Sequence, residues 1–209
     1  MRIAHWAVTL CALALLVSGI EILISHPRFY WGENGTSLTT PLFSFPIPSS
    51  RRTVPTGYGY VLPDQNGWSR YLHFEAAWAL VLVGALYVIH GLFSGHITND
   101  LAPLRSARST DGDDTWTYNR LQRLTYLAVI LLMFPLIVWT GLAMSPAFVS
   151  AIPATVTLLG GRQTARTLHF FLSVALVLFV IGHVAMVWRA GFVRRVTAMI
   201  TGRSRDEAL

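Results

Sequence analysis

Four long apolar stretches dominate the sequence and restrict what the chain can fold into. They cover approximately residues 6–24, 72–93, 124–144 and 168–188. Each approaches the ~20 residues that an α-helix needs to cross the hydrocarbon core of a bilayer. Helices satisfy their backbone hydrogen bonds internally, and a membrane interior tolerates few other structures. We therefore expect an all-α integral membrane protein, in which residues 1–209 form one domain built on a four-helix bundle.

The low content of charged residues supports this expectation. Only 12% of the residues are charged, about half of the ~25% that soluble domains carry. The first stretch is longer than the apolar part of a secretory signal peptide, and no small-residue cleavage site follows Ile24. We therefore expect a retained helix there. Cys11 is the only cysteine, which excludes an intramolecular disulfide and a multi-cysteine metal centre.

The arginines indicate how the chain crosses the membrane. The net charge of +6 comes without any lysine, and the arginines flank the apolar stretches. This distribution argues against a nucleic-acid partner. With four spans the termini share one side, which holds ten arginines against six on the other side. The excess predicts cytoplasmic termini in a bacterial inner membrane and a long periplasmic loop over residues 25–71, whose aromatic side chains should fold over the outer end of the bundle.

Histidines in the apolar stretches suggest a cofactor. His169 and His183 are 14 residues apart, which places them on nearly the same helix face and about 21 Å apart along the axis. His73 lies at the depth of His169 and His5 at the depth of His183, so that each pair bridges two helices. Paired imidazoles inside a bundle are the axial ligands of six-coordinate haem. The simpler alternative is a haem-free anchor whose histidines form hydrogen bonds between helices.

His90 is an alternative inner ligand. It follows His73 by 17 residues, about 100° around the helix, so the two cannot face one partner helix equally well. We prefer His5 to His90 as the partner of His183. His26 and His96 fall at loop edges, where we expect them to face solvent.

Other residue types near the histidines suggest supporting roles. Three arginines lie just outside the histidine depths and would pair with haem propionates or anchor the helices at the interface: Arg70, Arg166 and Arg189. Three glycines would let a macrocycle approach the backbone or allow close helix packing: Gly19, Gly84 and Gly182. Glu21 and Glu75 lie near the outer ends of their spans, where carboxylates often mark proton paths. Their simpler role is to reach the interface or to pair with Arg70.

Several segments resemble a known family. Arg2-Ile-Ala-His5-Trp6 resembles the Arg-x-x-His-Trp opening of bacterial di-haem cytochrome b subunits, which include the bacterial cytochrome b561 family and the cytochromes b of nickel hydrogenases and formate dehydrogenases. The 14-residue histidine spacing resembles the same group. Four segments are similar to a narrower, thiosulfate-reductase-type branch that accompanies molybdopterin oxidoreductases: residues 26–32 (HPRFYWG), 93–96 (FSGH), 118–126 (YNRLQRLTY) and 199–203 (MITGR). No further helix is evident beyond Trp188, which disfavours the five-helix hydrogenase relatives.

The resemblance implies two b-type haems and electron exchange with membrane quinone. It implies that His5 and His183 hold the inner haem iron, and that His73 and His169 hold the outer one. Our main hypothesis is an electron-transfer subunit that connects quinone or quinol with a periplasmic redox partner, such as a molybdopterin oxidoreductase. Whether the chain is an enzyme by itself, and whether copies of it associate in the lipid, stays open.

The alternative function is a self-sufficient superoxide:quinone oxidoreductase. It would require an open basic funnel to the outer haem, formed by Arg70, Arg162 and Arg166, that attracts the anion. The long first loop argues against such an open face.

Overall fold

The computed structural model describes residues 2–36, 38–47, 66–94, 125 and 127–202. Most of these residues are helical, as the apolar stretches predicted, and the expected all-α membrane class is confirmed. Three helices are long and apolar enough to cross a membrane: α1 (Arg2–Ser25), α2 (Asn66–Phe93) and α7 (Arg162–Arg189). Residues 95–124, which include His96, lie outside the described residues.

The third apolar stretch forms a shorter helix with an irregular start. A π-helical turn, η4 (Ala128–Met133), leads into α4 (Phe134–Leu142), and Pro135 occupies the first turn of α4. Proline has no backbone N–H to donate, and π-type turns are one of the local adjustments that accommodate it in membrane helices. The described helical segment, Ala128–Leu142, is shorter than the three spanning helices.

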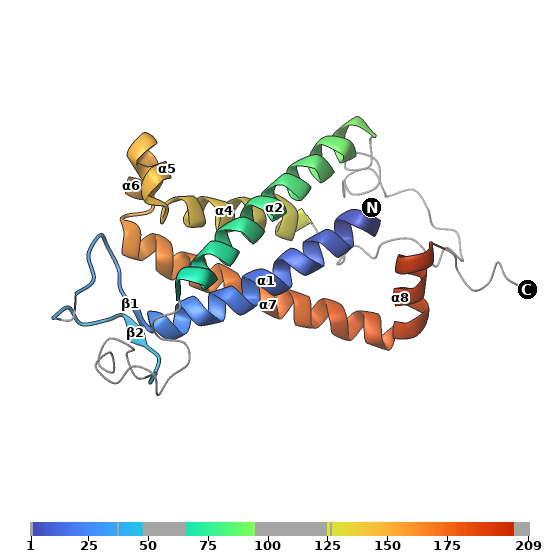
Figure 1. Ribbon diagram of the computed structural model, residues 1–209, viewed down its shortest axis with the longest axis horizontal. Helices are drawn as coiled ribbons and strands as arrows, with labels where there is room; N and C mark the ends of the chain where they lie inside the picture. Colours follow the sequence, from blue (N-terminus) through green and yellow to red (C-terminus); the bar gives the residue numbers. More distant parts are fainter. Residues whose placement is uncertain (1, 37, 48–65, 95–124, 126, 203–209) are drawn as a thin grey trace, which may run out of the picture.

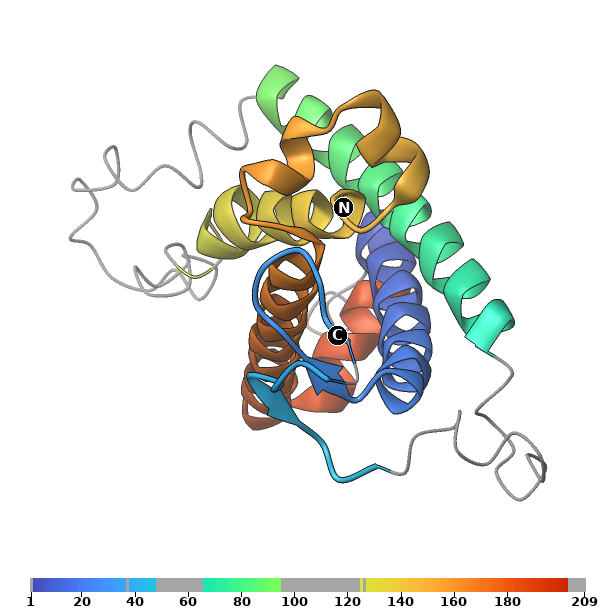
Figure 2. The ribbon, with the colours of Figure 1, turned by 90° about the vertical axis from the view of Figure 1, so that its left-hand side faces the viewer.

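The long helices associate in two pairs. α1 packs along α2, and α4 packs along α7. Figure 1 shows α2 crossing α1 obliquely, and the end-on view of Figure 2 shows α4 against α7. The predicted histidine positions are therefore divided between two helix pairs that face each other.

The connection between α4 and α7 holds the best-buried apolar cluster of the described residues. It contains the short helices α5 (Pro146–Ala151) and α6 (Ala154–Thr157). Its buried residues are Ala143, Val149, Val156 and Ala165. The indole Nε1 of Trp139 donates to the carbonyl oxygen of Thr155 at 3.0 Å, which ties α6 to α4. This cluster fixes the end of α7 that carries His169.

A small hairpin from the first loop packs against the same end of α7. Strands β1 (Arg28–Phe29) and β2 (Phe43–Ser44) pair in antiparallel fashion. The rings of Phe29 and Phe43 stack with centroids 4.6 Å apart, and Phe29 also contacts Phe170 on α7 at 4.7 Å. The described part of the loop thus covers α7 with aromatic side chains.

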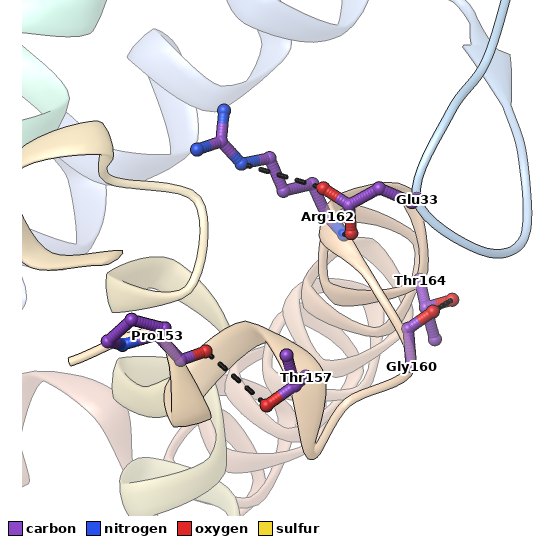
Figure 3. A network of polar contacts seen from close by, with 6 residues as sticks. All are labelled: Glu33, Pro153, Thr157, Gly160, Arg162 and Thr164. Carbon is purple, nitrogen blue, oxygen red and sulfur yellow. Dashed lines mark hydrogen bonds and ion pairs between the residues drawn. The ribbon is translucent and has the colours of Figure 1, made fainter. Parts of the chain in front are cut away.

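The residues after the hairpin's first strand cap the N-terminus of α7. The carbonyl oxygen of Gly32 accepts from the backbone N–H groups of Gln163 (3.0 Å) and Thr164 (3.2 Å). Glu33 accepts from the N–H of Arg162 at 3.2 Å, and its carboxylate lies 3.9 Å from the Arg162 guanidinium (Figure 3). These contacts satisfy N–H groups that every helix start leaves without an intrahelical partner, and a carboxylate there is favoured by the helix dipole.

A further helix follows α7, although none was evident from the sequence beyond Trp188. Gly191, in a left-handed conformation with φ of 93°, ends α7 and begins α8 (Phe192–Thr201). With 10 residues α8 is too short to cross a bilayer. The indole Nε1 of Trp6 donates to the carbonyl oxygen of Met199 at 3.4 Å. The start of α1 and helix α8 therefore lie at the same end of the bundle (Figure 1).

Candidate cofactor site

His73 and His169 face each other between the two helix pairs. His73 belongs to α2 and His169 to α7, and their ring centroids are 6.2 Å apart with an interplanar angle of 62°. Both side chains are half-buried. The structure therefore brings together the two histidines that the sequence predicted at the outer depth.

Ser18 on α1 binds the ring of His73. Its hydroxyl donates to the carbonyl oxygens of its own helix, at Ala14 (2.7 Å) and Leu15 (3.2 Å). The same oxygen lies 2.9 Å from Nδ1 of His73. A serine hydroxyl has one hydrogen and two lone pairs. The donor in the Ser18–His73 contact depends on the tautomer of His73: a hydroxyl hydrogen directed at the backbone goes with Nδ1–H donating to the hydroxyl and with Nε2 keeping its lone pair.

Thr140 on α4 binds the ring of His169 in the same manner. Its hydroxyl donates to the carbonyl oxygens of Leu136 (2.9 Å) and Ile137 (3.0 Å), and lies 3.0 Å from Nδ1 of His169. Ser18 and Thr140 are both fully buried. Each histidine of this pair is thus fixed by a hydroxyl from the neighbouring helix of its own pair.

A glycine follows each hydroxyl residue and makes room for the ring. A Cβ atom at Gly19 would lie 3.8 Å from Cε1 of His73, and one at Gly141 would lie 3.4 Å from Cε1 of His169. The other two glycines that the sequence singled out have different surroundings. Gly84 accommodates the ring of Phe134, which favours its role in helix packing, and Gly182 has open space beside it.

The second pair, His5 and His183, joins α1 to α7. Their ring centroids are 6.3 Å apart at an interplanar angle of 49°. Both side chains are exposed, and within the described residues neither ring makes a hydrogen bond to a side chain. Phe179 stacks on His183 with centroids 6.2 Å apart. This pair has the spacing of the first pair without its hydroxyl partners.

The remaining predicted histidine sites differ from these pairs. His90 is exposed on α2, and among the described residues its ring contacts no other histidine ring. His26, expected to face solvent, is instead half-buried and lies between two arginines. Arg70 donates to its Nε2 at 3.3 Å, and Arg166 donates to its carbonyl oxygen.

The other candidate residues, two arginines and two glutamates, lie on the same helices as the histidines. Arg166 is half-buried with its guanidinium 4.8 Å from the centre of the Phe29 ring, whereas Arg189 is exposed at the end of α7. Glu21 is half-buried on α1 and Glu75 is exposed on α2. In the described part of the chain neither carboxylate forms an ion pair, and the expected pairing with Arg70 is not present.

The spacing of both histidine pairs fits a shared metal ion. An imidazole nitrogen binds a metal at about 2 Å and lies about 1 Å from its ring centre, so two imidazoles on opposite sides of one ion have centroids about 6 Å apart. The observed distances are 6.2 and 6.3 Å. No group of three or more metal-ligating side chains occurs among the described residues. Two imidazoles at this spacing are a ligand set that would suit haem, with His73 and His169 or His5 and His183 as the residues that would hold it.

The sequence did not reveal Ser18 and Thr140. Hydroxyl residues inside helices commonly bond to their own backbone, as both do here, so neither residue stands out from its surroundings. The only local signal is the glycine that follows each of them, Gly19 and Gly141. Which histidine ring lies beside each of these glycines depends on how the helices cross, and the sequence does not show this.

Comparison with known proteins identifies the family. Residues 1–202 match the prokaryotic cytochrome b561 family. A curated relative, the putative protein-methionine-sulfoxide reductase subunit YedZ1 of Azospira oryzae, is 30% identical over 97% of this chain and 93% of its own length. No solved structure matches the chain. The family match covers the described helices and both histidine pairs. The chain is therefore a member of the prokaryotic cytochrome b561 family, a bacterial membrane protein that transfers electrons with haem b.

Proposed function

We propose that the chain carries electrons across the membrane between quinone or quinol and a periplasmic oxidoreductase partner, through two b-type haems. His73 and His169 would hold one haem iron, and His5 and His183 the other. The observation that carries this proposal is the spacing of the two pairs, whose ring centroids lie 6.2 and 6.3 Å apart. Each pair bridges two helices, as axial ligands in a bundle core do.

The residues of the chain bind and orient the cofactor. When bound, haem carries one electron at a time through its iron, and the protein tunes the potential by ligands and burial. His73 and His169 present Nε2 because Nδ1 of each donates to a hydroxyl. Arg70 and Arg166 lie one turn before these histidines and would attract propionates, and Arg189 would do so at the opposite end.

The partner is proposed from the relative and from the resemblance of the sequence. The curated relative is named as a subunit of a putative protein-methionine-sulfoxide reductase. A partner reductase, of the molybdopterin class that the sequence segments suggest, would receive the electrons in the periplasm. The hairpin and its aromatic side chains, at the end of the bundle that holds His73 and His169, would form the docking surface.

Two acidic residues are proposed for proton transfer with quinone. Glu21 lies one turn after Ser18, and Glu75 lies two residues after His73. Neither carboxylate is committed to an ion pair within the described residues. Ionisable groups at membrane depth are costly and frequently serve proton movement. Both would accept protons released by quinol at the outer side.

The arrangement of the arginines does not favour the superoxide alternative. Arg70 and Arg166 both bind His26, and Arg166 additionally contacts the Phe29 ring. Arg162 lies beside the carboxylate of Glu33. Arg166 is half-buried and Arg162 has an acidic neighbour, so Arg70 alone of the three is both exposed and without a carboxylate partner among the described residues. A basic funnel for anion steering needs cations whose charge is directed to the opening.

The haem content of histidine variants tests the ligand assignment. We expect two haems per purified wild-type chain, with a reduced b-type absorbance band. His169→Ala should lose only the outer haem and His183→Ala only the inner one, so each variant should retain one haem per chain. His90→Ala is the matched control and should retain two. Loss of a haem in His90→Ala with retention in His5→Ala would reverse the inner assignment, and a wild-type chain without haem would refute the proposal.

Stopped-flow reduction tests the electron donor. Quinol should reduce the haems of the purified protein in detergent, and a periplasmic reductase partner should reoxidise them. Rapid reduction of quinone by the isolated protein with superoxide as the sole electron donor would instead support the self-sufficient oxidoreductase.

A further inference from the structure

We propose that Ser18 and Thr140 are positioning residues that set the tautomer, the ring orientation and the electron-donating strength of the outer ligands His73 and His169. The proposal rests on the haem ligation proposed above. It assigns a specific role to two buried hydroxyls that bind the rings of the outer pair. In the part of the chain that the structure describes, the rings of the inner pair have no such hydroxyl beside them.

The hydrogen-bonding capacity of the two hydroxyls supports this role. Each has one hydrogen, and each lies within 2.7–3.0 Å of a backbone carbonyl oxygen one turn earlier in its own helix. With its hydrogen used in this way, each hydroxyl oxygen can offer the histidine only a lone pair, and so it can act only as an acceptor. Nδ1 of His73, at 2.9 Å, and Nδ1 of His169, at 3.0 Å, must therefore be the donors. Both rings are then in the Nδ1–H tautomer, in which the unprotonated Nε2 is the atom that can bind the iron.

Burial makes this arrangement hard to replace. Ser18 and Thr140 are 0% and 1% exposed, so water does not compete for either hydroxyl. Gly19 and Gly141 leave the space in which the edge of each ring, at Cε1, rests against the helix. The hydroxyl holds Nδ1 and the glycine backbone lies next to Cε1. Together they restrict rotation of the histidine side chain about χ1 and χ2.

The hydrogen bonds also affect the iron ligands electronically. A ligand histidine that donates its other N–H to an oxygen is a stronger electron donor to its metal. Stronger donation stabilises the oxidised iron and lowers the reduction potential. The outer pair has two such bonds, whereas in the described structure the rings of His5 and His183 have none. Removing either hydroxyl should therefore raise the potential of the outer haem and leave the inner one unchanged.

The test uses single hydroxyl deletions in the full-length protein. Thr140→Val and Ser18→Ala remove the acceptor, Thr140→Ser keeps it, and Ser173→Ala is the matched control. The Ser173 hydroxyl donates to the carbonyl oxygen of His169 at 2.7 Å and does not touch the ring. Redox titration and low-temperature electron paramagnetic resonance of the oxidised protein report the potential and the ring orientations. Repeating the titration in His183→Ala, which should retain only the outer haem, assigns the component that moves.

We expect Thr140→Val and Ser18→Ala to raise the outer potential, alter the outer resonance and weaken haem retention by about tenfold. Thr140→Ser and Ser173→Ala should match the wild type. If the variants fold with two haems and keep the wild-type potential and resonance, the positioning role is wrong while the proposed ligation stands. If Thr140→Ser shifts the potential as far as Thr140→Val, the effect is one of packing and the hydroxyl role is refuted. A wild-type protein that lacks haem would overturn the proposed function itself.

Discussion

Gly32 and Thr164 bind each other reciprocally. The backbone N–H of Gly32 donates to Oγ1 of Thr164 at 2.8 Å, and the backbone N–H of Thr164 donates to the carbonyl oxygen of Gly32 at 3.2 Å. Three residues further along α7, the buried hydroxyl of Thr167 donates to the carbonyl oxygen of Tyr30 at 2.8 Å. The first loop therefore fixes the start of the helix that presents His169.

Thr164→Val should destabilise the protein by about 1–3 kcal/mol, because the N–H of Gly32 would lose its acceptor at a site where Thr164 is only 2% exposed. Thermal unfolding in detergent, followed by circular dichroism, measures the change. Thr157→Val is the control, because the Thr157 hydroxyl is exposed and, among the described residues, bonds to the nearby carbonyl oxygens of Pro153 (Figure 3) and Ala154. Equal stability of the two variants would argue against a structural role for the loop contact.

Gly161→Ala should also destabilise the start of α7, by more than about 1 kcal/mol. Gly161 has φ of 118°, and an added Cβ would lie 2.5 Å from the carbonyl carbon and oxygen of Gly32. The same unfolding measurement applies. Gly67→Ala, where an added Cβ meets nothing within 4 Å, should unfold close to the wild type. A wild-type melting temperature for Gly161→Ala would show that the loop can move aside without cost.

Gly141→Ala should reduce outer haem content, because the new Cβ would lie 3.4 Å from Cε1 of His169, at the short limit of ordinary van der Waals contact, and would restrict adjustment of the ring. The haem-to-protein ratio and the reduced absorbance band of the purified variant measure the loss. Gly182→Ala adds the same methyl group beside His183, where it meets nothing within 4 Å, and should retain both haems. Parallel loss in both variants would indicate general sensitivity of the helices to alanine.

Glu21→Gln and Glu75→Gln should slow quinol-dependent reduction by at least about tenfold if these carboxylates accept the protons. Haem content should stay at the wild-type level, since neither side chain contacts a histidine ring among the described residues. Stopped-flow absorbance measures the rate. In the control variant Glu33→Gln, at an exposed loop position, quinol should reduce the haems as fast as in the wild type. Unchanged rates in both acidic variants would remove them from the proton path.

The helices were predictable because hydropathy and length determine them together. The stretch that follows His5 and the stretches that include His73 and His169 are apolar for about 20 residues, and the bilayer leaves such segments little choice of structure. The irregular start of α4 was harder to predict, since Pro135 signals a disturbance without specifying a π-turn. α8 was missed because Arg194 and Arg195 interrupt its apolar residues, which therefore form no continuous stretch long enough to stand out.

From the sequence we could predict only how deep in the membrane each histidine lies along its helix. Counting residues placed His73 with His169 and His5 with His183, and the structure brings each of these pairs into ring contact. Depth does not determine which neighbour touches the other side of a ring. The hydroxyls of Ser18 and Thr140 meet Nδ1 because α1 crosses α2 and α4 lies on α7 at particular angles, which side-chain packing between the helices decides.

One consequence of α7 concerns distance. This single helix supplies one member of each histidine pair, whereas the other members come from two different helices. Fourteen residues of continuous backbone separate His169 from His183, about 21 Å of rise that changes in lipid or packing can hardly stretch. If the proposed ligation holds, α7 would therefore keep the two haem irons at a fixed separation. A variant that slows transmembrane electron flow is then expected to have lost a centre or altered its energy level, while the gap the electron must cross stays the same.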